Sequence, residues 1–184
     1  MTIVQCLERI TNWLQENVCN KIKLKAAQDK DEEKFEEVNP TAFTLFQPGK
    51  TQAPPSVKVL MPSVVVQIVD GNDDLTKSLN RLKLQLSFIA WNPGKHKAEG
   101  ASSALEPNAD GWKDVWNFVE HALQEIENAE YLNDLRVVKE LGITYGPFSQ
   151  DGALVDMYPY WGAWVILTIE QGLARTGASY KNLL

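Results

Sequence analysis

Apolar residues recur over the first part of the chain at the spacing of an amphipathic helix. The apolar positions are Ile3, Leu7, Ile10, Leu14 and Val18, and their intervals place them on one helical face. Thr2 and Gln5 fit a capping box, in which each side chain accepts a hydrogen bond from the other residue's backbone N–H. We therefore predict a helix that follows Thr2 and ends near Asn20.

After this helix the chain becomes strongly charged and then rich in proline. Residues 21–25 alternate between lysine and apolar side chains, which favours a short edge strand; continuation of the helix is the alternative. Residues 29–37 contain six acids and two lysines and offer nothing for a core, so we predict a solvated acidic loop or arm. A short strand is predicted at residues 43–46, between prolines.

Two strands are predicted in the middle of the chain. Residues 63–69 are mostly β-branched, which favours a strand that is buried on both faces and therefore central in a sheet. Residues 71–74 are typical of a turn. Polar residues then alternate with Leu82, Leu84, Leu86 and Phe88, as in a strand with one face in the core. The short connection predicts an antiparallel pair.

The second half of the chain begins with a segment that has no clear periodicity. Residues 92–110 are rich in Pro, Gly, Ser, Ala and Asn, and we predict a long loop of the kind that is often functional. A second amphipathic helix follows, with Asp110 as its N-cap and Asp114 in its first turn, where a carboxylate suits the helix dipole. One face of this helix carries Trp112, Val115, Trp116, Val119, Leu123 and Ile126.

An irregular segment at residues 131–135 precedes two more predicted strands, at residues 137–145 and 160–170, and residues 172–184 form a polar tail. This order of elements predicts an α+β fold, with a mainly antiparallel sheet flanked by an N-terminal helix and a second amphipathic helix. The chain has 184 residues, and we expect residues 1–171 to form a single domain.

The composition narrows the functional classes. Hydrophobic residues make up 44% and charged residues 23%, as in ordinary globular proteins. The net charge of −6 argues against a dedicated nucleic-acid binder, which normally carries a basic face. We expect neither a signal peptide nor a membrane span, because the apolar runs are short or interrupted. Cys6 and Cys19 on one helix would lie about 20 Å apart, beyond disulfide reach, which favours a reducing, intracellular compartment.

Few patterns point to catalysis or metal binding. Asp70, Asn72 and Asp74 have the spacing of a calcium loop but lack the glycine and glutamate of an EF-hand, so we interpret them as a polar turn. His96 on the long loop and His121 on a polar helix face are a poor basis for a triad or a metal site. Phosphate-loop, dinucleotide and nucleophile-elbow motifs are absent. We expect no catalytic, cofactor-binding or metal-ligating residue, no cofactor, and a protein that is not an enzyme.

Aromatic side chains concentrate near residue 160. Because Tyr and Trp are enriched at interface hot spots, we predict that Tyr158, Tyr160 and Trp161 contribute to an interface. Core packing is the alternative interpretation of these aromatic residues. For Trp116 and Trp164 we expect core positions.

The order and size of these segments resemble those of the tail-terminator, or tail-completion, proteins of long-tailed phages and phage-tail-like particles. The resemblance rests on residues 62–68, the strand 82–91, the helix 111–127 after a long loop, and the closing segment 161–167. With the leading helix it covers most of residues 1–171. It concerns element order and size rather than a short signature, so no functional residue is transferred from the family.

The resemblance implies a structural role. Proteins of this family are small α+β subunits that assemble into a ring, typically with six-fold symmetry. The ring caps the tail tube, ends its polymerisation and docks a neck or sheath. The expected partners are further copies of the chain, the tail tube protein and sheath or neck proteins, with no specific nucleic acid and no membrane. The expected location is the host cytoplasm during assembly and then the virion or tail-like particle.

Two other functions stay open at this point. A neck or head–tail adaptor protein would have the same size and composition. A small ligand-binding domain or enzyme would use residues 92–110 as a lid, with His96 as its base, although nothing near His96 in the sequence completes a catalytic set.

Overall fold

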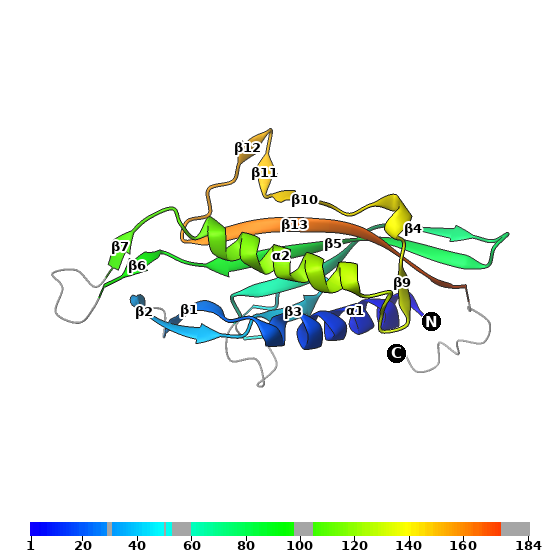
Figure 1. The fold of residues 1–184 in the computed structure, drawn as a ribbon, viewed down its shortest axis with the longest axis horizontal. Helices are drawn as coiled ribbons and strands as arrows, with labels where there is room; N and C mark the ends of the chain where they lie inside the picture. The colour runs from blue at the N-terminus through cyan, green and yellow to red at the C-terminus, as the bar shows by residue number, and fades with distance from the viewer. Residues whose placement is uncertain (29–30, 50, 53–59, 98–104, 174–184) are drawn as a thin grey trace.

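The computed structural model describes residues 1–28, 31–49, 51–52, 60–97 and 105–173. A seven-stranded sheet runs along the long axis of the molecule, in the order β3-β4-β5-β13-β9-β8 with β10 also paired to β13 (Figure 1). Its strands are β3 (Thr41–Thr44), β4 (Ser63–Asp74), β5 (Leu79–Trp91), β8 (Tyr131–Leu132), β9 (Leu135–Val137), β10 (Thr144–Pro147) and β13 (Tyr160–Gly172). Among the described strands of this sheet, β3 and β4 alone pair in parallel. The predicted α+β class with a mainly antiparallel sheet is confirmed.

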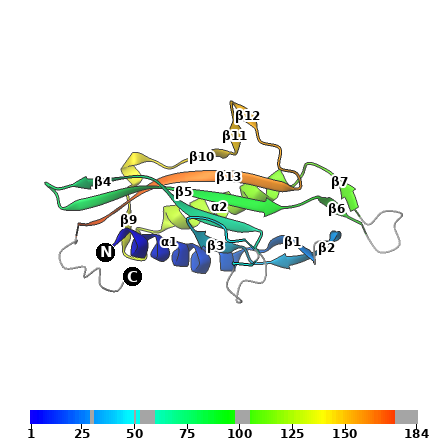
Figure 2. The same ribbon diagram turned by 180° about the vertical axis from the view of Figure 1, so that it is seen from behind.

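Three small two-stranded sheets lie outside this main sheet. The pairs are β1 (Leu24–Gln28) with β2 (Asp31–Val38), β6 (Gly94–His96) with β7 (Leu105–Pro107), and β11 (Ser149–Gln150) with β12 (Ala153–Leu154). Figure 2 shows the β6–β7 pair at one end of the long axis and the turn between β4 and β5 at the other. The two ends of the molecule are therefore built from different elements.

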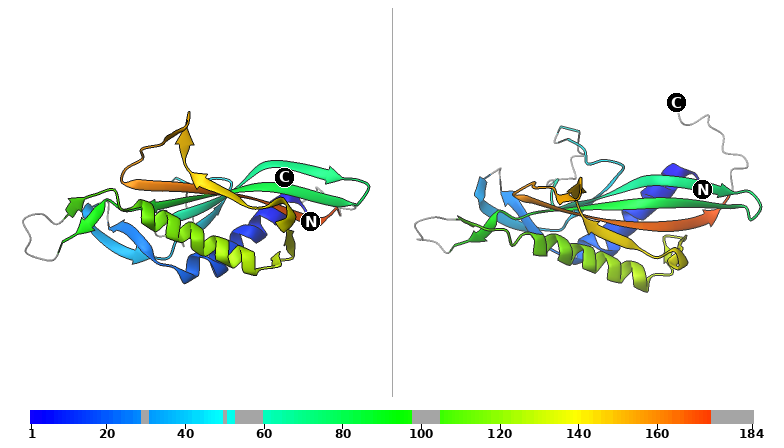
Figure 3. Two further views of the ribbon diagram at one scale, coloured as in Figure 1. Left: turned by 45° about the horizontal axis from the view of Figure 1, so that its top comes forward. Right: turned by 90° about the horizontal axis from the view of Figure 1, so that it is seen from above.

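Two helices, α1 (Ile3–Asn17) and α2 (Trp112–Asn128), cover the same face of the sheet (Figure 3). The core lies between them and the sheet, and Phe88 meets Phe118 of α2 edge-on with ring centroids 4.9 Å apart. As the alternation of apolar residues predicts, every second residue of β5 and β13 is buried there: Leu82, Leu84, Leu86, Phe88, Ala163, Val165, Leu167 and Ile169. Burial of this continuous apolar face is the main force that holds the two layers together.

The N-terminal helix begins with the predicted capping box. The side chain of Thr2 accepts a hydrogen bond from the Gln5 N–H at 3.2 Å, and the Gln5 side chain accepts one from the Thr2 N–H at 3.0 Å. The helix ends at Asn17, and a short 3₁₀ turn, η1 (Cys19–Lys21), follows it. Ile3 in the first turn is exposed, so the buried face starts with Cys6 and Leu7.

The acidic segment 29–37 is not a loop or arm in its described part. From Asp31 onward it is strand β2, which pairs antiparallel with β1. Backbone hydrogen bonding does not depend on side-chain charge, and β1 supplies the apolar contacts through the buried Leu24 and Ala26. The edge strand predicted at residues 21–25 is β1, which begins later, at Leu24.

The strand predicted at residues 63–69 is central, with β3 on one side and β5 on the other, but it continues to Asp74. The turn predicted at residues 71–74 is therefore wrong, because those residues pair with residues 79–82 of β5, and the turn occupies residues 75–78. The strand predicted at 43–46 is β3, which ends at Thr44.

The described part of segment 92–110, predicted as a long loop, contains two short strands. It contains the β6–β7 pair, with residues 98–104 outside the described residues. Gly94 has a φ of +139°, and a Cβ there would overlap the backbone of Glu106 and Asn108, so only glycine allows the two strands to approach.

The start of α2 differs from the prediction. Its N-cap is Gly111, not Asp110, whose carboxylate instead accepts a hydrogen bond from the Lys113 ammonium at 2.8 Å. Trp112, predicted on the core face, is 50% exposed. The residues of α2 that are buried are Val115, Phe118, Val119, Ala122 and Ile126.

The single strand predicted at residues 137–145 is two strands. β9 ends at Val137 and β10 starts at Thr144, with a 3₁₀ turn, η2 (Lys139–Leu141), between them. Both pair with β13, at different positions along it. The irregular segment 131–135 is the tight β8–β9 hairpin, in which Asn133 and Asp134 have positive φ angles, as two-residue hairpin turns require.

The last strand, predicted at residues 160–170, is β13 and runs to Gly172. The Leu173 N–H then donates a hydrogen bond to the carbonyl of Ser78 at 2.7 Å, which ties the end of β13 to the β4–β5 turn. The rest of the predicted polar tail, from residue 174, lies outside the described residues.

Candidate interaction surface

The three aromatic residues predicted for an interface lie where β13 begins. Tyr158 and Tyr160 are 44% and 40% exposed, and Trp161 is half-buried. Tyr158 and Trp161 line the same surface hollow, whereas Tyr160 is outside it. The structure thus brings two of the three together.

This hollow has a volume of about 510 Å³ and two walls. One wall is residues 107–109, which connect β7 to α2, and the other is the segment that leads from β12 to β13. Leu154 and Val155 on the second wall are 71% and 40% exposed. Asp156 is the single ionisable carboxylate of the lining, so the hollow is mainly apolar with one negative charge on its wall.

A buried asparagine supports Trp161, one of the residues that line the hollow. Asn92 is 7% exposed, and its side-chain amide N–H donates a hydrogen bond to the Asp114 carboxylate at 2.6 Å. Its side-chain oxygen accepts a hydrogen bond from the Gly94 N–H at 2.9 Å. Its backbone carbonyl accepts the indole N–H of Trp161 at 2.9 Å. Asn92 therefore joins β5, the β6–β7 pair, α2 and β13. The sequence analysis did not identify this residue, because Asp114 and Trp161 are distant from it in the chain.

Two further contacts hold the aromatic residues Tyr158 and Trp161 in place. The Tyr158 hydroxyl donates a hydrogen bond to the carbonyl of Pro93 at 2.7 Å. Gly111, at the start of α2, lies so close to Trp161 that a Cβ would overlap the indole ring. The hollow is therefore a preformed feature of the fold, built on several elements rather than on one loop.

The residues considered for catalysis are dispersed. His96 lies on β6 and packs against Phe35 with ring centroids 4.4 Å apart. His121 lies on α2 and is half-buried, and its Nε2 has no hydrogen-bond partner within the described part of the chain. No group of three or more His, Cys, Asp or Glu residues suited to a metal ion occurs in the described ranges.

The calcium-like triplet Asp70, Asn72 and Asp74 lies on strand β4 rather than in a turn. The Asp74 carboxylate accepts hydrogen bonds from the N–H groups of Thr76 and Lys77, so it is used to close the β4–β5 turn. The three residues therefore serve strand pairing and turn formation.

The two cysteines are free and buried. Burial raises the pKa of the Cys6 thiol to about 11 and that of the Cys19 thiol to about 12. Because the thiolate is the reactive form, both thiols are poor nucleophiles near neutral pH.

Charged side chains form a row across the sheet face opposite the helices. Glu170 on β13 accepts hydrogen bonds from Arg81 on β5 (2.8 Å) and Arg136 on β9 (3.1 Å), and Arg136 also contacts Glu140 (2.5 Å). The hydrogen bond from Arg81, followed by that from Arg136, holds the pKa of Glu170 below its usual value. These charges satisfy one another and pin three strands in register.

Trp164 is on this same face. It is half-buried and donates its indole N–H to the carbonyl of Pro147 on β10 at 2.9 Å, so the core position predicted for it is wrong. The odd-numbered neighbours of Trp164 on β13 face the helices instead. Trp116 packs against the main core, as predicted.

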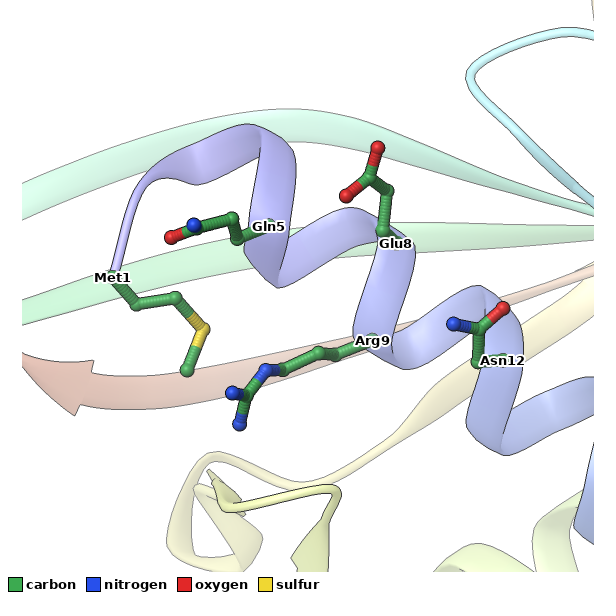
Figure 4. Close-up of a pocket in the computed structure, with 5 residues that line it drawn as sticks. All are labelled: Met1, Gln5, Glu8, Arg9 and Asn12. Atoms are coloured by element: carbon green, nitrogen blue, oxygen red, sulfur yellow. The ribbon is translucent and has the colours of Figure 1, made fainter.

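A second hollow, of about 470 Å³, follows the solvent side of α1 (Figure 4). It is lined by Met1, Gln5, Glu8, Arg9 and Asn12. Gln5 belongs to the capping box, and Arg9 forms an ion pair with Asp134 at 2.7 Å. Two of its polar side chains, Gln5 and Arg9, therefore already serve the fold, and the hollow by Tyr158 and Trp161, with its exposed apolar side chains, is the better candidate for binding.

Comparison of the sequence with models of known protein families found no match, and a search of curated proteins found none either. No helix in the described ranges is long and apolar enough to cross a membrane.

Proposed function

We infer that this chain is a structural subunit of a phage tail or phage-tail-like particle. It forms a ring of about six copies that caps the tail tube and ends its polymerisation. Its partners are further copies of itself and the tail tube protein, with a sheath or neck protein on the outer side. It acts in the host cytoplasm during assembly and then remains in the particle.

The observation that carries this proposal is the preformed apolar hollow beside Tyr158 and Trp161. Its exposed side chains are large and apolar, as at protein interfaces, and Asn92 anchors the lining residue Trp161 to the neighbouring elements. A surface of this kind suits docking of protein. The order of helices and strands that resembles tail-terminator proteins is the second support.

Ring assembly places a further requirement on the subunit. Each copy needs two different, complementary surfaces, because the contacts in a ring are heterologous. This fold has different elements at its two ends, with the β4–β5 turn at one and the β6–β7 pair at the other. That arrangement is compatible with contacts from one copy to the next.

Deletion of the chain from the phage or cell that encodes it tests the proposal. We expect electron micrographs to show tubes of uncontrolled length, and a plasmid copy of the chain to restore uniform tails. Tails of normal length that fail to join heads would instead identify a neck or head–tail adaptor protein. Unchanged particles would reject both structural roles.

A further inference from the structure

The β4–β5 hairpin ends in a turn that presents a leucine to solvent. Residues 75–78 form the turn, and Leu75 is 77% exposed. The Asp74 carboxylate closes the turn by accepting hydrogen bonds from the N–H groups of Thr76 (3.1 Å) and Lys77 (3.0 Å). The tip is therefore an ordered structure that holds an apolar side chain in water.

The apolar hollow lies toward the other end of the molecule. Figures 1 and 2 both place the tip of β4–β5 at one end of the long axis, and β7 with the start of α2 toward the opposite end. The hollow is lined partly by residues 107–109 from that second region. The tip and the hollow of one copy therefore cannot meet, but those of two neighbouring copies can.

Charge and apolar character match between the two surfaces. The tip carries Lys77, which lies 3.9 Å from Asp74 and so already has one carboxylate neighbour in its own hairpin. Its side chain is 65% exposed, which leaves the ammonium group open to a second carboxylate. The hollow carries Asp156, which forms no ion pair with any described residue. Leu75 would meet the exposed side chains of Leu154 and Val155. Opposite charges beside an apolar contact favour one orientation over others.

We propose that the β4–β5 tip of one copy docks in the hollow of the next copy, with Leu75 against Leu154 and Val155 and Lys77 beside Asp156. The inference rests on the proposed ring, and it names the surfaces that link its subunits. The contact is heterologous, since tip and hollow are different surfaces, so repetition produces a closed ring when the rotation between copies closes.

A symmetric contact between two hollows is the main structural alternative. It would place two Asp156 carboxylates close to each other in an apolar setting, which is unfavourable. A contact between two tips would leave the apolar hollow and Asp156 without a partner. The tip-to-hollow contact avoids both.

Disulfide trapping between variants that each add one cysteine to the native chain tests the contact. Leu75→Cys and Leu154→Cys are made as separate proteins, mixed and mildly oxidised, and the products are separated on non-reducing gels. The native Cys6 and Cys19 are buried with raised pKa values, so they contribute little background. Leu141, which is 60% exposed on η2, provides the matched control Leu141→Cys.

We expect a cross-linked dimer from the mixture of Leu75→Cys with Leu154→Cys, in clear excess over each variant alone. The double variant should form a ladder of higher oligomers. Equal cross-linking of Leu75→Cys with Leu141→Cys, or of Leu75→Cys with itself, would overturn the proposal. Absence of any tip-to-hollow product at the highest soluble concentration would also overturn it.

A second measurement separates failure of this contact from failure of the proposed function. Native mass spectrometry measures the oligomeric state of the free, unmodified chain, and electron microscopy shows whether the chain forms rings in particles. Rings without the cross-link reject the contact and leave the tail role standing. The cross-link in a chain whose deletion leaves tails unchanged supports the contact and rejects the tail role.

Discussion

The indole N–H of Trp161 donates a hydrogen bond to the backbone carbonyl of Asn92 at 2.9 Å, across 69 positions of sequence. The same asparagine binds Asp114 and Gly94 through its side chain. This pair therefore connects the first residue after β5 with the start of the last strand. It also anchors Trp161, which lines the apolar hollow.

Asn92→Ala should destabilise the protein. The substitution leaves the Gly94 N–H without its acceptor in a buried position, a loss that typically costs about 1–3 kcal/mol. Asn12→Ala is the control, because Asn12 is exposed on α1. We expect a lower urea midpoint for Asn92→Ala alone, with an unchanged slope. Equal midpoints for the two variants would show that Asn92 does not support the fold.

Gly111→Ala tests the contact between α2 and Trp161. A Cβ at Gly111 would overlap the indole, and overpacking of this kind costs about 1–3 kcal/mol. Gly172→Ala is the matched control, because a Cβ there meets no atom within 4 Å. We expect the unfolding free energy to fall for Gly111→Ala and to stay within about 0.5 kcal/mol for the control. The tryptophan fluorescence of Gly111→Ala should also differ from that of the native chain, because the substitution displaces the indole of Trp161.

The periodic parts of the fold could be predicted from the sequence. The capping box at Thr2, the alternation from Leu82 to Phe88 and the apolar run of β13 all depend on local spacing. The described parts of two segments predicted as loops, residues 29–37 and 92–110, contain strands instead: β2 in the first, β6 and β7 in the second. Strands pair through backbone groups, which every sequence has. A composition rich in charge, glycine and proline therefore does not reveal that these segments pair.

The candidate site was only partly predictable. Clustering of aromatic residues suggested Tyr158 and Trp161, but it also suggested Tyr160, which lies outside the hollow. Asn92 was missed, since a single asparagine in a polar segment has no periodic signal. The need for glycine at position 111 depends on where Trp161 lies in space, which no local pattern gives.

Glu170 should make the stability of the protein depend on pH in the acidic range. Its folded pKa is lowered, first by the hydrogen bond from Arg81. The stabilisation is therefore present above the unfolded pKa, about 4.3 for glutamate, and is lost as the pH falls through the lower folded value. Glu170→Gln should reduce this acid-side loss, because the amide does not titrate. Glu120→Gln, on the exposed side of α2, is the control.

Chemical unfolding between pH 3 and 7 measures this effect. We expect the free energy of unfolding to fall less steeply below about pH 4.3 in Glu170→Gln than in the native chain. At neutral pH the same variant should be less stable, because Arg81 and Arg136 lose their shared negative partner. Parallel pH curves for Glu170→Gln and the native chain would contradict the assignment.

The native thiols should resist modification until the protein unfolds. Burial raises the pKa of Cys6 to about 11 and of Cys19 to about 12, so little thiolate forms at pH 8. We expect an aromatic disulfide reagent to react with neither thiol in the folded chain and with both in urea. Leu141→Cys supplies an exposed thiol as a reference. Rapid reaction of two native thiols without denaturant would show that α1 opens readily.

Charge reversal should weaken and then restore the contact between copies. Lys77→Glu places a negative tip beside Asp156 of the next copy, and Asp156→Lys places a positive wall beside Lys77, so each change alone should lower the assembled fraction by about tenfold. The double variant exchanges the two charges and should recover much of the loss, because the attraction is restored with its sign reversed.

Sedimentation velocity of the two single variants and the double variant measures this coupling. Lys113→Glu is the control, because Lys113 is an exposed lysine that pairs with Asp110 within its own chain. Thermal melts check that every variant is folded before assembly is compared. Losses in the single variants that simply add in the double variant would show that Lys77 and Asp156 act independently, and the tip would then not lie in the hollow.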